Sequence, residues 1–90
     1  MNGYHEEFHR YLRKIKIQFY NNPEKLYSVK YFSKKHDIKY ARAFAMLERL
    51  RTQGFVLRFY LSANQTLRAW GIPHPIFSLY VLNQTGYKQL

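Results

Sequence analysis

The stretch SVKYFSKKHDIKYARAFAMLERLRTQGFV, residues 28–56, decides the fold that the sequence predicts. Ser28 is a good N-cap, and apolar or small side chains recur after it at the spacing of a short helix over residues 29–36. After a turn, a second helix is expected over residues 39–53, and Gly54 follows as its C-cap glycine. Its buried stripe is expected to be Tyr40, Ala43, Phe44, Leu47 and Leu50. Two helices joined by a short turn therefore form the centre of the predicted fold.

A longer amphipathic helix is predicted before this stretch, over residues 5–20. Its apolar side chains recur every three or four residues and so lie in one narrow stripe: Phe8, Leu12, Ile15 and Phe19. The cluster Asn21-Asn22-Pro23 ends the helix, because the residue before a proline is pushed out of the α region. Residues 26–27 then form a short extended piece.

A hairpin and a last helix are predicted after the two central helices. Residues 55–61 and 76–82 are short, aromatic and β-branched, which predicts two antiparallel strands. Residues 62–75 are expected to be the loop between them, and residues 83–90 a short capped helix. This order fits a single α+β domain over residues 1–90, with a three-helix core and an antiparallel sheet of two or three strands.

Three segments resemble winged helix-turn-helix proteins. Residues 28–38, SVKYFSKKHDI, resemble the first helix and turn of winged-helix regulators. Residues 47–56, LERLRTQGFV, resemble the Leu-x-x-Leu-x-x-x-Gly-apolar-apolar passage from recognition helix into wing. Residues 80–90, YVLNQTGYKQL, are similar to the segment that closes the wing of multiple-antibiotic-resistance-type and phenolic-acid-type repressors. The resemblance implies a winged helix with its helix-turn-helix over residues 28–53 and its wing over residues 55–82.

The chain departs from the pattern of that family at three positions. Asp37 occupies the turn where glycine is common, His36 stands where the family usually has Leu, and Asn83 replaces the usual Thr. The ligand-sensing and dimerising helices of the larger repressors are expected to be absent or cut short. In size the chain is similar to small winged-helix proteins of archaeal viruses and plasmids.

The composition favours a polyanionic partner. The chain has 15 Lys+Arg against 5 Asp+Glu, a net charge of +10, which attracts nucleic acid, an anionic membrane surface or an acidic protein. Since it has no cysteine, a disulfide scaffold, a thiol nucleophile and a Cys-ligated zinc site are excluded. No apolar run approaches the about 18–20 residues of a membrane span. Glu6, Glu7 and Arg10 stand where a signal peptide would be apolar, so a cytoplasmic protein is expected.

The second central helix is the candidate recognition helix. Small residues between arginines let a helix enter a major groove of about 12 Å, where arginine pairs with guanine. The residues expected to contact DNA from this helix are Lys39, Ala41, Arg42, Ala45 and Arg49. Arg42 and Arg49 are expected to project from the face opposite the core. The alternative for each of these side chains is an ordinary solvated surface.

Other basic and polar residues are expected to hold the DNA backbone. Phosphate contacts, which give affinity without sequence information, are expected from Lys30, Lys34, Lys35, Arg13 and Lys14. In the wing, DNA contacts are expected from Arg68, Gln65 and Thr66, whereas Trp70 is expected to pack the wing onto the body.

The aromatic residues have two interpretations. Nine tyrosines and seven phenylalanines could stack on single-stranded bases. Most fall at core spacing, among them Tyr40, Phe44, Phe55, Phe59, Phe77 and Tyr80, so core packing is the expected use.

One motif is typical of zinc enzymes. His5-Glu6-Glu7-Phe8-His9 fits H-E-x-x-H, but zinc would need a third ligand, from His36 or His74, and a cleft. The two glutamates also complement the dipole at a helix N-terminus. No Gly-rich phosphate loop and no Ser/His/Asp set is present, so no enzyme activity, no metal and no cofactor are expected.

The sequence thus predicts a sequence-specific double-stranded DNA-binding protein, a transcriptional regulator. An RNA- or ribosome-associated winged helix and a winged-helix protein adaptor are the alternatives. A homodimer is expected, because Ile17 and Tyr11 leave apolar surface on the first helix. Neither a membrane nor a small-molecule ligand is expected as a partner.

Overall fold

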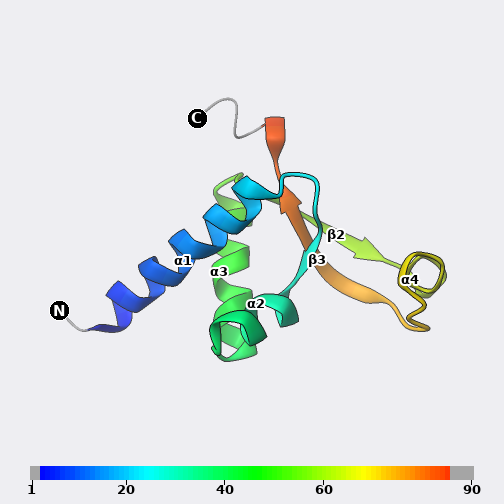
Figure 1. Ribbon diagram of the computed structural model, residues 1–90, viewed down its shortest axis with the longest axis horizontal. Helices are drawn as coiled ribbons and strands as arrows, with labels where there is room; N and C mark the ends of the chain where they lie inside the picture. Colours follow the sequence, from blue (N-terminus) through cyan, green and yellow to red (C-terminus); the bar gives the residue numbers. More distant parts are fainter. Residues whose placement is uncertain (1–2, 86–90) are drawn as a thin grey trace.

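The computed structural model describes residues 3–85 (Figure 1). In this range the chain forms four helices and three strands. Their order is α1 (Gly3–Asn21), β1 (Tyr27–Ser28), α2 (Val29–His36), α3 (Tyr40–Thr52), β2 (Val56–Leu61), α4 (Ala63–Trp70) and β3 (Ile76–Leu82). The strands make an antiparallel sheet in the order β1-β3-β2. The predicted α+β class and the predicted antiparallel hairpin are confirmed.

The three N-terminal helices and one face of the sheet enclose the hydrophobic core. Helix α1 contributes Leu12, Ile15 and Phe19, as the predicted stripe requires. From the sheet come Tyr27 and Tyr80, which are register partners on β1 and β3, and Val56 with its partner Leu82. The β2–β3 hairpin extends away from the helices and carries α4 at its far end (Figure 1).

Helix α2 has the bounds that the sequence predicts. The hydroxyl of Ser28 accepts a hydrogen bond from the Tyr31 amide at 3.1 Å, which is the expected N-cap. At the other end Asp37 is left-handed, with φ 52° and ψ 51°, and its amide donates to the carbonyls of Ser33 and Lys34. The Ser33 hydroxyl also donates to the Ile38 carbonyl at 2.7 Å and so ties the helix to the turn.

The predicted stripe of α3 is partly wrong. Ala43, Leu47 and Leu50 are fully buried as expected, together with Met46, but Tyr40 is 56% exposed and Phe44 is 37% exposed. The helix is rotated toward Met46, because apolar residues and alanines occur on more than one of its faces and the contacts with the rest of the core select among them. It ends at Thr52 with Gln53 as C-cap, and Gly54 follows with φ 80°.

The predicted loop over residues 62–75 is wrong, since it contains the helix α4. Ser62 caps this helix through a capping box: its hydroxyl accepts from the Gln65 amide, and the Gln65 side chain accepts from the Ser62 amide. Gly71 ends the helix with φ 70°. The hairpin is therefore closed by a short, capped helix.

Two further expectations concern the C-terminal segment and membrane-spanning helices. The predicted C-terminal helix over residues 83–90 falls mainly on residues 86–90, which lie outside the described residues. Within residues 3–85 no helix is both long enough and apolar enough to cross a membrane.

Candidate nucleic-acid interface

The face of α3 opposite the core is lined by small side chains. Ala41, Ala45 and Thr52 are exposed there, one turn or two apart, and Glu48 lies between them along the helix. The buried residues of α3 lie on the other side of the helix axis. A helix with such a face can approach the surface of another molecule closely.

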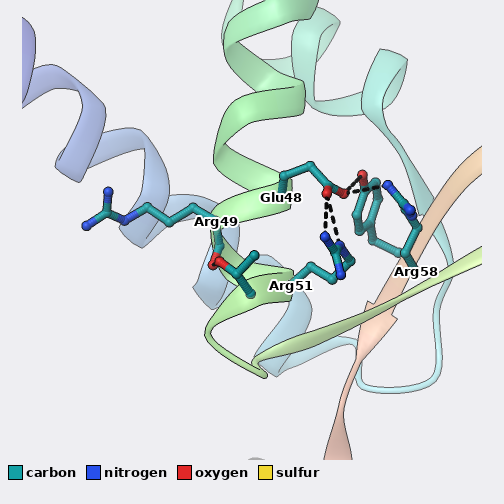
Figure 2. Close-up of polar contacts among 6 residues, drawn as sticks. Glu48, Arg49, Arg51 and Arg58 are labelled. Atoms are coloured by element: carbon teal, nitrogen blue, oxygen red, sulfur yellow. Dashed lines mark hydrogen bonds and ion pairs between the residues drawn. The ribbon is translucent and has the colours of Figure 1, made fainter.

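Basic side chains flank this small-residue face on both sides (Figure 2). Arg49 is exposed and extends toward α1, where its guanidinium lies 5.9 Å from the centre of the Phe8 ring. Arg51 and Arg58 lie on the opposite side and converge on Glu48. Three guanidinium groups thus border the exposed face of α3.

The expectation that Arg42 projects from the face opposite the core is wrong. Its side chain is half-buried, and the Nε and Nη2 atoms of its guanidinium are buried. The rotation of α3 toward Met46 brings Arg42 to the flank of the core-facing side. Arg42 is therefore part of the packing around α3, unlike the exposed Arg49.

Glu48 is the centre of a polar cluster that joins α3 to the hairpin (Figure 2). Its Oε1 accepts from Nε and Nη2 of Arg51, both at 2.9 Å. Its Oε2 accepts from Nη1 of Arg58 at 3.1 Å and from the hydroxyl of Tyr80 at 2.7 Å. Because Arg58 lies on β2 and Tyr80 on β3, one carboxylate connects three elements of the fold.

The cluster shifts the pKa values of Glu48 and Tyr80. Burial by itself raises the pKa of Glu48, but hydrogen bonds from Arg51 and Tyr80 and the charge of Arg58 outweigh it and lower the pKa below its usual value. Burial and then the hydrogen bond to Glu48 raise the pKa of Tyr80 to about 12. At neutral pH the cluster therefore holds a carboxylate, two guanidinium ions and a neutral phenol.

The basic residues of α1 and α2 that were expected to bind phosphate are exposed, namely Arg13, Lys14, Lys30, Lys34 and Lys35. Two of them also contact the protein itself. Lys35 donates to Oε1 of Gln18 on α1 and lies 5.7 Å from the centre of the Tyr31 ring. Lys14 lies 5.7 Å from the centre of the Tyr11 ring. Lys30 borders a hollow of about 460 Å³ that Tyr40 and His74 also line.

The polar residues expected to bind DNA from the hairpin have other roles. Thr66 is fully buried, and its hydroxyl lies 2.7 Å from the His74 carbonyl and 2.9 Å from the Ile72 carbonyl. Gln65 is engaged in the capping box of α4. Thr66 therefore has no exposed surface with which to contact DNA, whereas Gln65 is exposed and its contact with DNA stays a prediction. Arg68 is exposed on α4.

Trp70 packs less completely than expected. It lines a hollow of about 280 Å³ together with Leu26 and Tyr31, but nearly half of its surface is exposed.

The exposed apolar residues of α1, on which the predicted dimer depends, differ in part from those expected. Tyr11 packs against the core, whereas Ile17 and Tyr20 are exposed on α1.

The H-E-x-x-H motif lies at the start of α1. Glu7 faces Arg10 with an oxygen-to-nitrogen distance of 3.9 Å. His36 belongs to the core side of α2, where its ring stacks on Phe32 with 6.2 Å between centres. Among the residues whose placement is described, no three His, Asp or Glu side chains gather where a metal ion would fit.

Glu48, Arg51 and Arg58 belong to this candidate interface but were not among the residues predicted for it. The spacing of Glu48 and Arg51, three residues apart on a helix, was a visible signal for an ion pair. The contribution of Arg58 needs the hairpin to fold back on α3, which no local pattern shows.

Comparisons with models of protein families, with curated proteins and with solved structures found no match to this chain.

Proposed function

We propose that this protein is a winged helix-turn-helix protein that binds double-stranded DNA and regulates transcription. In this proposal α2 and α3 are the helix-turn-helix, α3 is the recognition helix, and the β2–β3 hairpin with α4 is the wing. The observation that carries it is the exposed face of α3. Ala41, Ala45 and Thr52 form a small surface between Arg49 on one side and Arg51 and Arg58 on the other.

This face suits the major groove of DNA. The groove is about 12 Å wide, so a helix enters it fully only where its outward side chains are small. Arginine at the border of such a face can reach a base edge or a phosphate. Arg49 is the candidate for base recognition, because it is exposed and is not paired with Glu48. Arg42 is not retained in this role, since its guanidinium is largely buried.

The exposed basic residues of α1 and α2 support backbone binding. Together with the net charge of +10 they give the protein an attraction for any polyanion. We further propose a homodimer through α1, where Ile17 and Tyr20 are exposed apolar side chains. A two-fold dimer would bind two half-sites about one turn of DNA apart.

A second candidate is binding of single-stranded or structured RNA. It is favoured by aromatic side chains that were expected in the core and are exposed instead, namely Tyr40, Phe44 and Phe59. Exposed aromatic rings beside arginines can stack on unpaired bases. Duplex DNA remains the preferred ligand because the small-residue face of α3 has no use in base stacking.

Competition binding tests the proposal. A labelled duplex bound by the protein should be displaced better by unlabelled duplex DNA than by structured RNA or single strands. The binding constant should fall with salt with a log–log slope of about −4 to −7, if roughly 5–8 phosphates are neutralised. Better displacement by RNA would favour the second candidate, and a flat salt titration would contradict both. Selection of bound fragments from random duplexes would then give the preferred sequence.

A further inference from the structure

Glu48 stands in an unexpected place for a DNA-binding surface. It is one of five acidic residues in the chain, and it lies along the exposed face of α3. A negative charge there opposes the approach of a polyanion. Stability alone is a weak reason for its ion pairs, because solvent-exposed pairs contribute about 0–1 kcal/mol. The geometry of the cluster gives it a different role.

The carboxylate of Glu48 is itself held in a fixed position. The buried side chain of Tyr80 donates to it from β3, and the Glu48 side chain is only 21% exposed. A carboxylate anchored to the sheet in this way can hold other groups still. It holds Arg51 through two N–H donors and Arg58 through one.

Both guanidinium groups keep donors for another ligand. Each has five N–H donors in a planar fork. Arg51 uses its Nε and Nη2 atoms on Glu48, and Arg58 uses Nη1. Their side chains remain 39% and 41% exposed, so both can be reached from solvent. Arg51 belongs to the last turn of α3 and Arg58 to β2, which places the pair between helix and hairpin.

We propose that Glu48 is a positioning residue that holds Arg51 and Arg58 as a preformed site for one backbone phosphate of DNA. The inference rests on the proposed function and names the groups that seat the strand between α3 and the hairpin. The two non-bridging oxygens of a backbone phosphate accept two parallel N–H bonds from one guanidinium, and their other lone pairs can accept N–H bonds from a second guanidinium. Because Glu48 already immobilises both side chains, binding costs less side-chain entropy.

The test compares the direction in which two charge-removing substitutions change the affinity for DNA. Glu48→Gln and Glu7→Gln each remove one negative charge and raise the net charge from +10 to +11. Glu7 also pairs with an arginine, Arg10, but on α1. If Glu48 acted only through its charge, both variants would bind a 20-base-pair duplex more tightly. The proposal predicts that Glu7→Gln binds equally or slightly more tightly, and that Glu48→Gln binds about tenfold more weakly, because two arginines lose their position.

A second pair of variants keeps the proposal testable even if Glu48→Gln unfolds. Arg58→Lys and Arg10→Lys both conserve charge and leave the Tyr80–Glu48 bond in place. The first should bind about fivefold to tenfold more weakly, because an ammonium lacks the planar fork, and the second should bind as the parent does. Equal binding by Arg58→Lys, or equal or tighter binding by a folded Glu48→Gln, would overturn the phosphate site while DNA binding itself stands. Absence of duplex binding by the parent protein would overturn both the site and the proposed function.

Discussion

The hydroxyl of Tyr80, in the fully buried part of β3, donates a 2.7 Å hydrogen bond to Oε2 of Glu48 on α3. This bond connects the interior of the sheet to the face of the helix that we propose enters DNA. It fixes a carboxylate that in turn orients Arg51 and Arg58. The packing of the core and the arrangement of the basic surface are therefore linked through one side chain.

Removing this hydroxyl should destabilise the protein. Tyr80→Phe leaves the ring in place but removes a donor from a partly buried carboxylate, and hydrogen bonds to charged groups contribute about 1.5–3 kcal/mol. We expect the free energy of unfolding, measured in urea at pH 8, to fall by about that amount. Tyr40→Phe, at an exposed position of α3, is the control and should change it by less than about 0.5 kcal/mol.

The same pair should control stability at alkaline pH. The pKa of Tyr80 is raised from 10.0 to about 12 in the folded protein, so the folded state keeps its proton where the unfolded state has lost it. Stability from this group is present below pH 10 and is lost as the pH rises from 10 to about 12. Between pH 10 and 12 the free energy of unfolding should fall more steeply with pH in the parent protein than in Tyr80→Phe. Equal slopes would mean that Tyr80 does not cause the loss of stability.

His36 should make the protein less stable in mild acid. Burial, and then the charges of Lys35 and Lys14, lower the pKa of His36 below 6.5. Its Nε2 atom is buried without a hydrogen-bond partner among the described residues. The folded state thus favours neutral His36, and stability falls as the pH drops from 6.5 toward the lowered value.

Replacing this histidine by an apolar residue should therefore stabilise the protein. His36→Leu places a leucine beside Phe32 and removes the buried nitrogen. We expect about 1 kcal/mol of added stability at pH 5 and a smaller gain at pH 8. Thermal melts at both pH values measure this gain in stability, and His9→Gln, at an exposed position of α1, is the control. A loss of stability at pH 5 would show that the imidazole makes a favourable contact in the core.

Asp37 should be the easiest position at which to stabilise α2. It has a left-handed backbone, which glycine adopts without strain, and its carboxylate lies at the helix C-terminus, where a negative charge is unfavourable. Asp37→Gly is expected to raise the free energy of unfolding by about 0.5–1 kcal/mol, and Asp37→Asn, which removes the charge alone, by less. Chemical denaturation of both variants checks this. A decrease for Asp37→Gly would mean that the flexibility gained in the unfolded state outweighs the strain relieved.

Local signals predicted part of the fold to the residue. Helix α2 has the expected bounds because Ser28 and the turn at Asp37 mark them, and β3 has the expected bounds because its aromatic and β-branched run is sharply delimited. Helix α4 was missed although Ser62 and Gln65 have the spacing of a capping box. A segment of eight residues has little periodicity of its own to set against the nearby prolines.

The candidate site was less predictable than the fold. Apolar residues occur on several faces of α3, so its sequence does not choose between Phe44 and Met46 for the core, and this choice moves Arg42 out of the exposed face. Two of the three partners of Glu48, Arg58 and Tyr80, lie 10 and 32 residues away in sequence. Contacts of that separation depend on tertiary packing, which a one-dimensional pattern does not contain.

The central claim is that the small-residue face of α3 enters the groove of duplex DNA. Ala45 lies in the middle of that face and is exposed, so Ala45→Leu adds bulk without touching the core. Ala45→Ser exchanges the same residue for another small one and is the matched control. The free energy of unfolding of both variants should lie within about 0.5 kcal/mol of that of the parent, because exposed substitutions rarely change stability by more.

The most direct measurement is the affinity of these two variants for the duplex selected by the parent protein. Ala45→Leu should bind at least about tenfold more weakly, because the larger side chain keeps α3 out of the groove. Ala45→Ser should bind about as the parent does, because its side chain stays small. If Ala45→Leu is folded and binds the selected duplex with the affinity of the parent, α3 does not lie in the groove and the proposed interface is wrong.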